Sequence, residues 1–300
     1  MTRESIYEIL DDRFRRCAAG DQQLEVLYEG CRWAEGPLYF PAGRYLVWSD
    51  IPNDRLLRWD ETTGQVGVFR SPAGHPNGNA VDTRGRMITC EQGNRRVTRT
   101  EHDGSITVLA ERFAGHRLNS PNDAVVRSDG TVYFSDPDFG INSDYEGHRA
   151  ESEIGACNVY RIDPSGAVSL AADGLRGPNG LVLSANEERL YVSDSRANAI
   201  MLYGVSRDGS LGDGSIFATC GNGNFDNIRL DVDGRLWAAA CDGGVHCYDP
   251  DGTLIGRIRT PEMVANVTFG GAKRNRMFLA ANTTLYSLVV SVTGAPLPPA

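Results

Sequence analysis

Short apolar runs recur along the chain, each directly after a turn and each only about five residues long. With their turns, these runs read AGRYLVWSD, RGRMITCE, DGTVYFSD, EERLYVSD, DGRLWAAACD and RNRMFLAAN. Another short run precedes each of them, and one or two more follow, as RLLRWD and VGVFR do after the first. The pattern predicts four short strands per unit in six units. Units of this kind are typical of a β-propeller, so we predict an all-β, six-bladed β-propeller.

One polar position recurs in the same register in every unit. Eight or nine residues before each turn stands a side chain that carries a carboxylate or a carboxamide: Glu35, Asn77, Asn122, Asn179, Asp226 and Asn266. Each of these residues begins the innermost strand of its blade. Since innermost strands line the central channel of a propeller, the six side chains are expected to form a ring at one mouth of that channel.

Turn chemistry is the alternative explanation for this ring. Asn, Asp and Gly are common in turns that precede strands, which accounts for several of the asparagines. It explains poorly why two positions are carboxylates with bulky apolar neighbours, in RWAEGPLYF and NFDNIRLDV. We therefore favour a functional ring.

The chain is expected to form a single domain over residues 1–300. Residues 1–23 are predicted to be an N-terminal extension with a short helical segment, and residues 24–292 to form the propeller. The run LEVLYEG near the N-terminus is expected to supply the fourth strand of the last blade, which joins both ends of the chain in one sheet. Blade three carries a long insertion, residues 137–155, that is expected to overhang the mouth as a lid.

Composition narrows the class of protein. The 300 residues carry a net charge of −9, which argues against nucleic acid as a partner because phosphates require a basic face. No apolar run approaches the roughly 18–20 residues of a membrane helix. The first twenty residues mix charges and contain no apolar stretch, so no signal peptide is visible and a cytoplasmic location is expected; an upstream start would leave export open. The seven cysteines show no CxxC spacing, so we expect them to be scattered reduced thiols.

The predicted ring defines a hard oxygen site. Carboxylate and carboxamide oxygens suit Ca²⁺, Mg²⁺ or Mn²⁺, and Zn²⁺ less well. A cation held by three or four protein groups keeps positions open for water and substrate. Arg117 and Asn119, in the nearby segment GHRLNSPND, are able to hydrogen-bond a polyhydroxylated substrate. The sequence contains no GxSxG, HExxH or P-loop motif.

The motifs around the ring resemble those of a known family. WAEGPLYF, RLNSPND, GPNGLVLS and NFDNIRLDVDGRLW occur in order, and together they resemble the regucalcin, gluconolactonase and luciferin-regenerating-enzyme family. Two longer segments, PNGNAVDTRGRMITCEQGNRRVTR and GHRLNSPNDAVVRSDGTVYFSDPDFG, are similar to its bacterial gluconolactonase branch. The resemblance covers about residues 24–290. It implies a six-bladed propeller with a divalent metal in the central channel and hydrolysis of sugar lactones or related esters.

The resemblance also implies roles for residues of the ring. It assigns the metal ligands to Glu35, Asn179 and Asp226, and it makes Asp226 the general base that activates water. This chain has Phe225 and Asn227 where relatives commonly have Pro and Gly around that aspartate, which is expected to affect the pocket more than the metal.

The resemblance assigns the substrate-binding residues less closely than the metal ligands. Asn122 is expected to face the metal or the substrate, and Arg117 and Asn119 match substrate-side positions in a loop that varies in length across the family. Asp123 is expected to be a substrate contact or to support one.

The resulting prediction is a lactonase that depends on one divalent cation, with Ca²⁺ first and Mg²⁺, Mn²⁺ or Zn²⁺ open. Glucono-1,5-lactone is the expected small-molecule substrate. One alternative is a non-catalytic propeller that binds calcium or a protein partner. Another is an enzyme of the same kind that acts on a simple ester, a phosphotriester or another sugar's lactone. The oligomeric state is left open.

Overall fold

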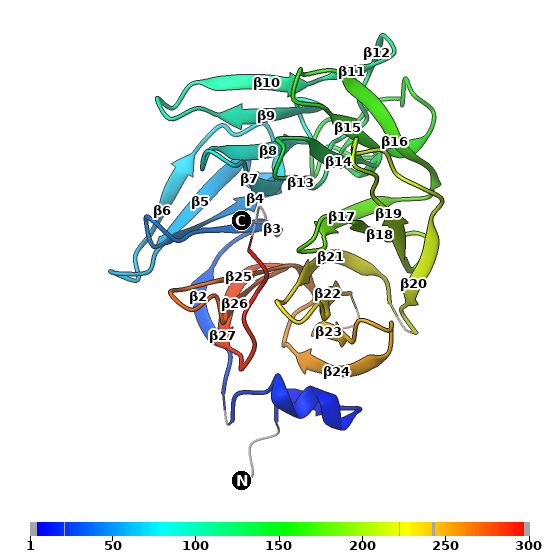
Figure 1. Cartoon of the computed structure of the whole chain (residues 1–300). Coiled ribbons are helices and arrows are strands. Elements are labelled where there is room, and N and C mark those ends of the chain that lie inside the picture. Colours follow the sequence, from blue (N-terminus) through cyan, green and yellow to red (C-terminus); the bar gives the residue numbers. More distant parts are fainter. Residues whose placement is uncertain (1–4, 21, 222, 242–243, 297–300) are drawn as a thin grey trace.

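Six antiparallel sheets stand around a common axis in the computed structural model of the chain (Figure 1). The structure describes residues 5–20, 22–221, 223–241 and 244–296. In each sheet the first strand lies against the first strands of the neighbouring sheets, and the later strands follow outward. The prediction of an all-β, six-bladed β-propeller is confirmed. Among the described residues, no helix is long and apolar enough to cross a membrane.

The first three blades have four strands each in the order of the sequence. Blade one comprises β3 (Ala34–Phe40), β4 (Tyr45–Asp50), β5 (Arg55–Asp60) and β6 (Val66–Arg70). Blade two comprises β7 (Pro76–Val81), β8 (Met87–Glu91), β9 (Arg96–Thr100) and β10 (Ile106–Ala110). Blade three comprises β13 (Ala124–Val126), β14 (Val132–Asp136), β15 (Cys157–Ile162) and β16 (Val168–Leu175). A small hairpin, β11 (Arg112–Phe113) and β12 (His116–Arg117), precedes blade three.

The last three blades include both N-terminal strands of the chain. Blade four comprises β17 (Pro178–Leu183), β18 (Arg189–Asp194), β19 (Ala199–Gly204) and β20 (Ser215–Thr219). Blade five comprises β21 (Phe225–Leu230), β22 (Leu236–Ala240), β23 (Gly244–Tyr248), β24 (Leu254–Arg259) and β1 (Tyr7–Ile9). Blade six comprises β25 (Val264–Gly270), β26 (Arg276–Ala281), β27 (Thr284–Val289) and β2 (Glu25–Glu29).

The N-terminal segment closes the ring. Strand β2 pairs with β27 as the outer strand of blade six, which confirms the expected closure by LEVLYEG. The expected short helical segment is the 3₁₀ helix η1 (Asp12–Arg16). Beyond that expectation, β1 pairs with β24 and adds a fifth strand to blade five. The fully buried Phe14 packs against Trp237 with ring centroids 6.0 Å apart, so this segment contributes to the core.

The hydrophobic core is divided among the interfaces between blades. The described residues form six clusters of buried side chains, and each cluster joins two neighbouring blades. The second strand of each blade lies between two such clusters and is buried along nearly its whole length. Strands that are buried on both faces read as continuous apolar runs. This is why the second strands gave the clearest repeat in the sequence, whereas β6, at the outside of blade one, is largely exposed.

Two further 3₁₀ turns lie outside the sheets, η2 (Ile51–Asn53) after β4 and η3 (Phe139–Ile141) after β14. The second of these opens the insertion of blade three. The insertion therefore starts where β14 reaches the mouth of the channel, and this places it over the ring of polar residues.

Candidate active site

The six predicted ring residues are all buried at the start of the innermost strands. Five of them line one pocket of about 430 Å³: Glu35, Asn77, Asn122, Asn179 and Asp226. The sixth, Asn266, reaches the same place through a hydrogen bond from its Nδ2 to Oε2 of Glu35 at 2.7 Å. A pocket of this size is ordinary for a small-molecule site. The structure therefore brings the ring together as the spacing of the repeat predicted.

Local backbone irregularities aim the ring side chains. The pairing of the innermost strand with the second strand shifts register at the ring position in five blades. Such bulges bend a strand and re-aim its side chains, and they are frequent beside active sites. In blade one, Gly36 follows Glu35 with φ of +51°, and a Cβ there would lie 2.1 Å from the carbonyl oxygen of Asn77. Only glycine fits where neighbouring strands approach this closely.

A serine in each of three second strands fixes the ring residue of the next blade. The serine Oγ donates to the ring residue's backbone carbonyl in three pairs: Ser49 to Asn77, Ser135 to Asn179 and Ser193 to Asp226. These serines belong to the WSD, FSD and VSD endings of the repeat. They tie each ring position to the preceding blade, so the ring geometry depends on the packing of adjacent blades.

The aspartate after each of these serines holds the loop of its own blade. Its carboxylate accepts hydrogen bonds from backbone N–H groups just before the innermost strand: Arg32 for Asp50, Asn119 and Ser120 for Asp136, and Arg176 and Gly177 for Asp194. The serine and aspartate together position the start of the innermost strand from two sides. This explains why the SD pair recurs in the sequence.

Glu35 is oriented by two donors that reach the same oxygen. The backbone N–H of Gly36 and the amide of Asn266 both donate to Oε2, at 2.8 and 2.7 Å. Among the described residues, Oε1 has no hydrogen-bond partner. Oε1 is therefore available to a ligand in the pocket.

Asn179 and Asp226 face the same pocket from neighbouring blades. The Nδ2 of Asn179 donates to Ser195 Oγ at 3.1 Å, and that hydroxyl donates onward to the carbonyl oxygen of Phe225 at 2.7 Å. This chain of bonds turns the amide nitrogen of Asn179 toward the protein. Asp226 Oδ1 is buried and has no partner within the described part of the chain.

Burial raises the pKa of the carboxyl groups of Glu35, Asp226 and Glu146, which line the pocket. Burial is the largest cause for both Glu35 and Asp226, and it moves the pKa of each above its ordinary value. The charges of Glu35 and Glu146 raise the pKa of Asp226 further, while the Asn179 amide opposes the rise. Burial also raises the pKa of Glu146 to about 7. Because the charge of Glu146 raises the pKa of Glu35 and of Asp226, the pocket gathers negative charge that favours a bound cation.

The insertion of blade three covers the pocket. Three of its residues, Phe139, Asn142 and Glu146, line the pocket, which confirms the expectation that this segment overhangs the mouth. The tip of the insertion reaches blade one, where Tyr145 Oη donates to the carbonyl oxygen of Arg32 at 3.0 Å.

The other end of the insertion is fastened to blade four. There the guanidinium of Arg196, which follows β18, pairs with Asp138 and lies over the ring of Phe139. The insertion thus spans the mouth between two blades.

The substrate residues expected from the sequence are placed differently from one another. Only Asn122 lines the pocket. Arg117 is half-buried at the small hairpin, where its Nη2 donates to the carbonyl oxygen of Asn94 at 3.3 Å. Asn119 is buried: its Nδ2 donates to the carbonyl oxygen of Ala156, and its Oδ1 accepts from Ser152. Neither Arg117 nor Asn119 lines the pocket, and their substrate role stays a prediction.

Asp123 and the two unusual neighbours of Asp226 lie away from the pocket lining. Asp123 Oδ2 accepts from Asn227 Nδ2 at 2.8 Å and pairs with the Arg229 guanidinium at 3.5 Å. Phe225 is fully buried in the core cluster between blades four and five. Phe225 and Asn227 therefore point into the body of the propeller, and the expectation that they reshape the pocket finds no support in its lining.

Several pocket residues were not singled out from the sequence: Trp33, Phe139, Asn142, Glu146, Ser195, Arg196, Asn224, Cys241 and Met263. Trp33 and Asn224 stand two residues before a ring position, so the ring register itself would have found them. Glu146 lies in a segment without a repeat, and no sequence signal marked it.

The donor atoms of the ring fit a divalent cation. Asn77 Oδ1, Asp226 Oδ1 and Asn266 Oδ1 are buried without a partner in the described structure. Buried acceptors of this kind require a donor or a cation. The described residues contain no group of three or more His, Cys, Asp or Glu side chains that could hold a metal ion. A cation here would therefore be held by a mixed set of carboxylate and carboxamide oxygens, which suits a hard dication.

Comparison with known proteins shows what this chain is similar to. The family model described as SMP-30/Gluconolactonase/LRE-like region matches residues 33–283. A gluconolactonase of Zymomonas mobilis is 30% identical over 288 residues, covering 86% of this chain and 79% of the relative. The pentonolactonase XacC of Haloferax volcanii is 28% identical, covering 85% and 83%. The structure of a gluconolactonase from Xanthomonas campestris superposes with a TM-score of 0.90 at 38% identity, covering 96% of both chains.

Proposed function

The chain belongs to the SMP-30/Gluconolactonase/LRE-like family, and on that basis we propose that it is a metal-dependent lactonase that opens sugar lactones. One observation carries the proposal. Glu35 and Asp226 face a single pocket beneath a covering loop, and each has an oxygen atom without a partner among the described residues. Buried carboxylates in this state are uncommon unless a ligand completes them.

The proposed cation ligands are Glu35, Asn179 and Asp226. Their oxygen atoms fit a divalent cation, and we propose Ca²⁺ first, because carboxylate and carboxamide oxygens are the ligands it prefers. Such a cation supplies a Lewis acid for the lactone carbonyl and eases the deprotonation of water.

The chain's own residues account for the proton transfers. Asp226 accepts a proton from water, whose oxygen forms a bond to the lactone carbonyl carbon. The bond between that carbon and the ring oxygen then breaks, and Asp226 returns the proton to the departing oxygen. The product is the open hydroxy acid, so one water is consumed and the atoms balance. Burial and the charges of Glu35 and Glu146 raise the pKa of Asp226, which makes its carboxylate a stronger base toward water.

The pocket supports a polyhydroxylated substrate. Asn77 and Asn122 present carboxamides that are able to bond sugar hydroxyls, and Glu146 presents a carboxylate from the covering loop. Trp33 and Met263 supply apolar surface beside them. This mixture suits the polar and carbon faces of a sugar ring, and we propose glucono-1,5-lactone as the first substrate to test.

The test measures lactone hydrolysis in wild-type protein, in chelator-treated protein and after separate additions of Ca²⁺, Mg²⁺, Mn²⁺ and Zn²⁺. Proton release is followed with glucono-1,5-lactone and with a five-carbon lactone, and spontaneous hydrolysis is subtracted. Loss on chelation with recovery by one ion is expected. Full turnover in the Asp226→Ala variant would contradict the proposed mechanism.

Two outcomes distinguish the alternatives. Faster turnover of the five-carbon lactone would change the substrate and keep the chemistry. Ion binding without hydrolysis of any lactone or simple ester would indicate a propeller that binds without catalysing.

A further inference from the structure

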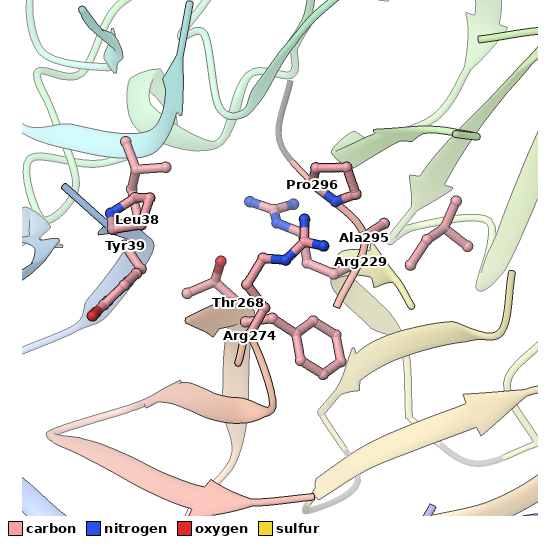
Figure 2. A pocket seen from close by; sticks show the side chains of 10 residues that line it. Leu38, Tyr39, Arg229, Thr268, Arg274, Ala295 and Pro296 are labelled. Carbon is pink, nitrogen blue, oxygen red and sulfur yellow. The ribbon is translucent and has the colours of Figure 1, made fainter. Parts of the chain in front are cut away.

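A second cavity of about 140 Å³ lies apart from the pocket of the ring. Figure 2 shows it from close by, with the side chains of Arg229, Arg274 and Thr268 among those that line it. Part of its wall comes from the C-terminal segment, where Ala295 donates its backbone N–H to the carbonyl oxygen of Leu230.

The cavity lies toward the far mouth of the central channel. Its residues stand two or three positions after ring residues on the same innermost strands: Leu38 after Glu35 on β3, Arg229 after Asp226 on β21, and Thr268 after Asn266 on β25. A strand rises about 3.3 Å per residue, so the two sites are separated by roughly 7–10 Å along each strand. The proposed lactonase chemistry uses none of these cavity residues.

Arg229 brings a buried positive charge to this cavity. Its side chain is about 5% exposed, and its Nη1 pairs with Asp123 and donates to the carbonyl oxygen of Ile228. Its Nε is buried and has no partner among the described residues. One edge of this guanidinium is therefore bonded by the protein, and the other retains hydrogen-bonding capacity.

Arg274 brings a second positive charge. Its side chain makes no hydrogen bond or ion pair with any part of the chain that the structure describes. Within the described residues, Asp123 is the one carboxylate that pairs with Arg229, so the two arginines leave an excess positive charge at the cavity. This stands out in a protein whose net charge is −9. Like charges that line one cavity repel each other unless an anion lies between them.

The other walls are largely apolar, with Leu38, Leu230, Phe269 and Pro296 among them. A cavity of roughly 150 Å³ with apolar walls is known to accept benzene. The volume and the walls therefore match a ring-sized apolar body, and the two arginines match an attached oxyanion. Arginine pairs with carboxylates through parallel hydrogen bonds.

We propose that this far-mouth cavity binds a small organic carboxylate with a compact apolar body. The carboxylate accepts hydrogen bonds from the guanidinium groups of Arg229 and Arg274 and from the hydroxyl of Thr268. The apolar body lies against Leu38 and Phe269. No covalent step is involved.

The test is isothermal titration of the full chain with benzoate, with benzyl alcohol as the uncharged analogue and inorganic phosphate as an anion without an apolar body. Saturable benzoate binding is expected, with each of the other two probes at least about tenfold weaker. Arg274→Gln removes the arginine that has no partner among the described residues, and it should raise the benzoate Kd about tenfold or more. Arg207→Gln, a change at an exposed arginine of a turn in blade four, is the matched control and should leave the Kd within about twofold.

The conservative variant Arg274→Lys separates charge from geometry. It should retain part of the affinity, because lysine keeps the charge without the planar fork. The proposal is overturned if wild-type protein shows no saturable benzoate binding below about 10 mM. It is also overturned if Arg274→Gln binds benzoate as tightly as wild type, which would place the ligand elsewhere, or if phosphate binds as tightly as benzoate. None of these readings depends on lactone hydrolysis.

Discussion

The pocket of the ring and the far-mouth cavity share three innermost strands but differ in charge. At their starts, β3 and β21 bring Glu35 and Asp226 to one pocket, where one oxygen of each carboxylate has no partner in the described part of the chain. Three residues after Asp226, β21 brings Arg229 toward the other mouth, where an ion pair with Asp123 holds it. The propeller therefore separates an acidic site from a basic one over the length of a single strand.

The two sites differ in how their buried charges are compensated. In the pocket of the ring the protein gathers like charges and supplies few hydrogen bonds to them, so a ligand has to complete the site. In the channel the protein itself supplies the opposite charge to Arg229, and Asp123 is correspondingly a partner within the fold. Neutralising a carboxylate should therefore have opposite effects on stability at the two places.

The largest effect is expected on activity from Asp226→Asn. Loss of the proposed base should lower kcat/KM by about 10³-fold. The same change should raise the stability of cation-free protein, because it removes a carboxylate that Glu35 repels in a buried site. Proton-release kinetics and urea unfolding in chelator measure the two effects.

Asp213→Asn, at an exposed aspartate whose side chain makes no hydrogen bond or ion pair with the described residues, is the matched control for Asp226→Asn. A cation-free Asp226→Asn protein that is less stable than wild type would show that the ring carboxylates do not repel one another.

The next effect is expected on stability from Asp123→Asn. This change leaves the buried Arg229 without its charge partner and should lower the free energy of unfolding by about 3 kcal/mol. Urea unfolding at matched pH gives the value. If Asp123 contacts substrate instead, the variant would keep its stability and lose kcat/KM.

A smaller effect is expected from Glu146→Gln in the covering loop. A hydrogen bond to a charged group contributes roughly 1.5–3 kcal/mol, so losing this carboxylate should lower kcat/KM for glucono-1,5-lactone about tenfold or more. A lactone without hydroxyls should be much less affected. Glu151→Gln, an exposed position in the same loop, provides the control. Equal losses for both lactones would argue against a hydroxyl contact.

The smallest effect is expected from pH on the free energy of unfolding of protein from which a chelator has removed the cation. Burial raises the folded pKa of Glu35 and of Glu146 above the ordinary value, the latter to about 7. Between about pH 4.5 and 7 the folded chain then binds more protons than the unfolded chain, so stability falls as pH rises through this window. Urea unfolding at pH 5 and pH 7 tests the sign. A saturating divalent cation should flatten or reverse this slope, because the cation favours the ionised carboxylates.

Most of the fold and the ring itself could be predicted from the sequence. Each of the six units is recognisable from a local pattern, and the ring position lies at a nearly fixed spacing from the turn of its unit. Counting by that spacing identified Glu35, Asn122, Asn179 and Asp226, which line one pocket in the structure. Closure by β2 was also predictable, because the last unit was short of a strand and an unassigned apolar run stood near the N-terminus.

The remaining parts of the site depend on contacts that have no local signal. Glu146 belongs to an insertion without a repeat. Its position over the pocket follows from a hydrogen bond of the insertion to blade one and an ion pair to blade four. Arg117 and Asn119 stand close to the ring in sequence, yet their bonds turn them toward the loops of blades two and three.

The sequence by itself determined which side chains begin each innermost strand, since the repeat sets strand number, spacing and direction. Only the tertiary structure decided which of those side chains remain free for a ligand. Asp226 stands at a ring position and Asp123 stands one residue after another ring position, but Asp123 meets Arg229 and Asp226 meets other carboxylates. The physical reason is that the free energy of a buried charge depends on its neighbours across blades, and those neighbours are set by packing between segments that lie far apart in the chain.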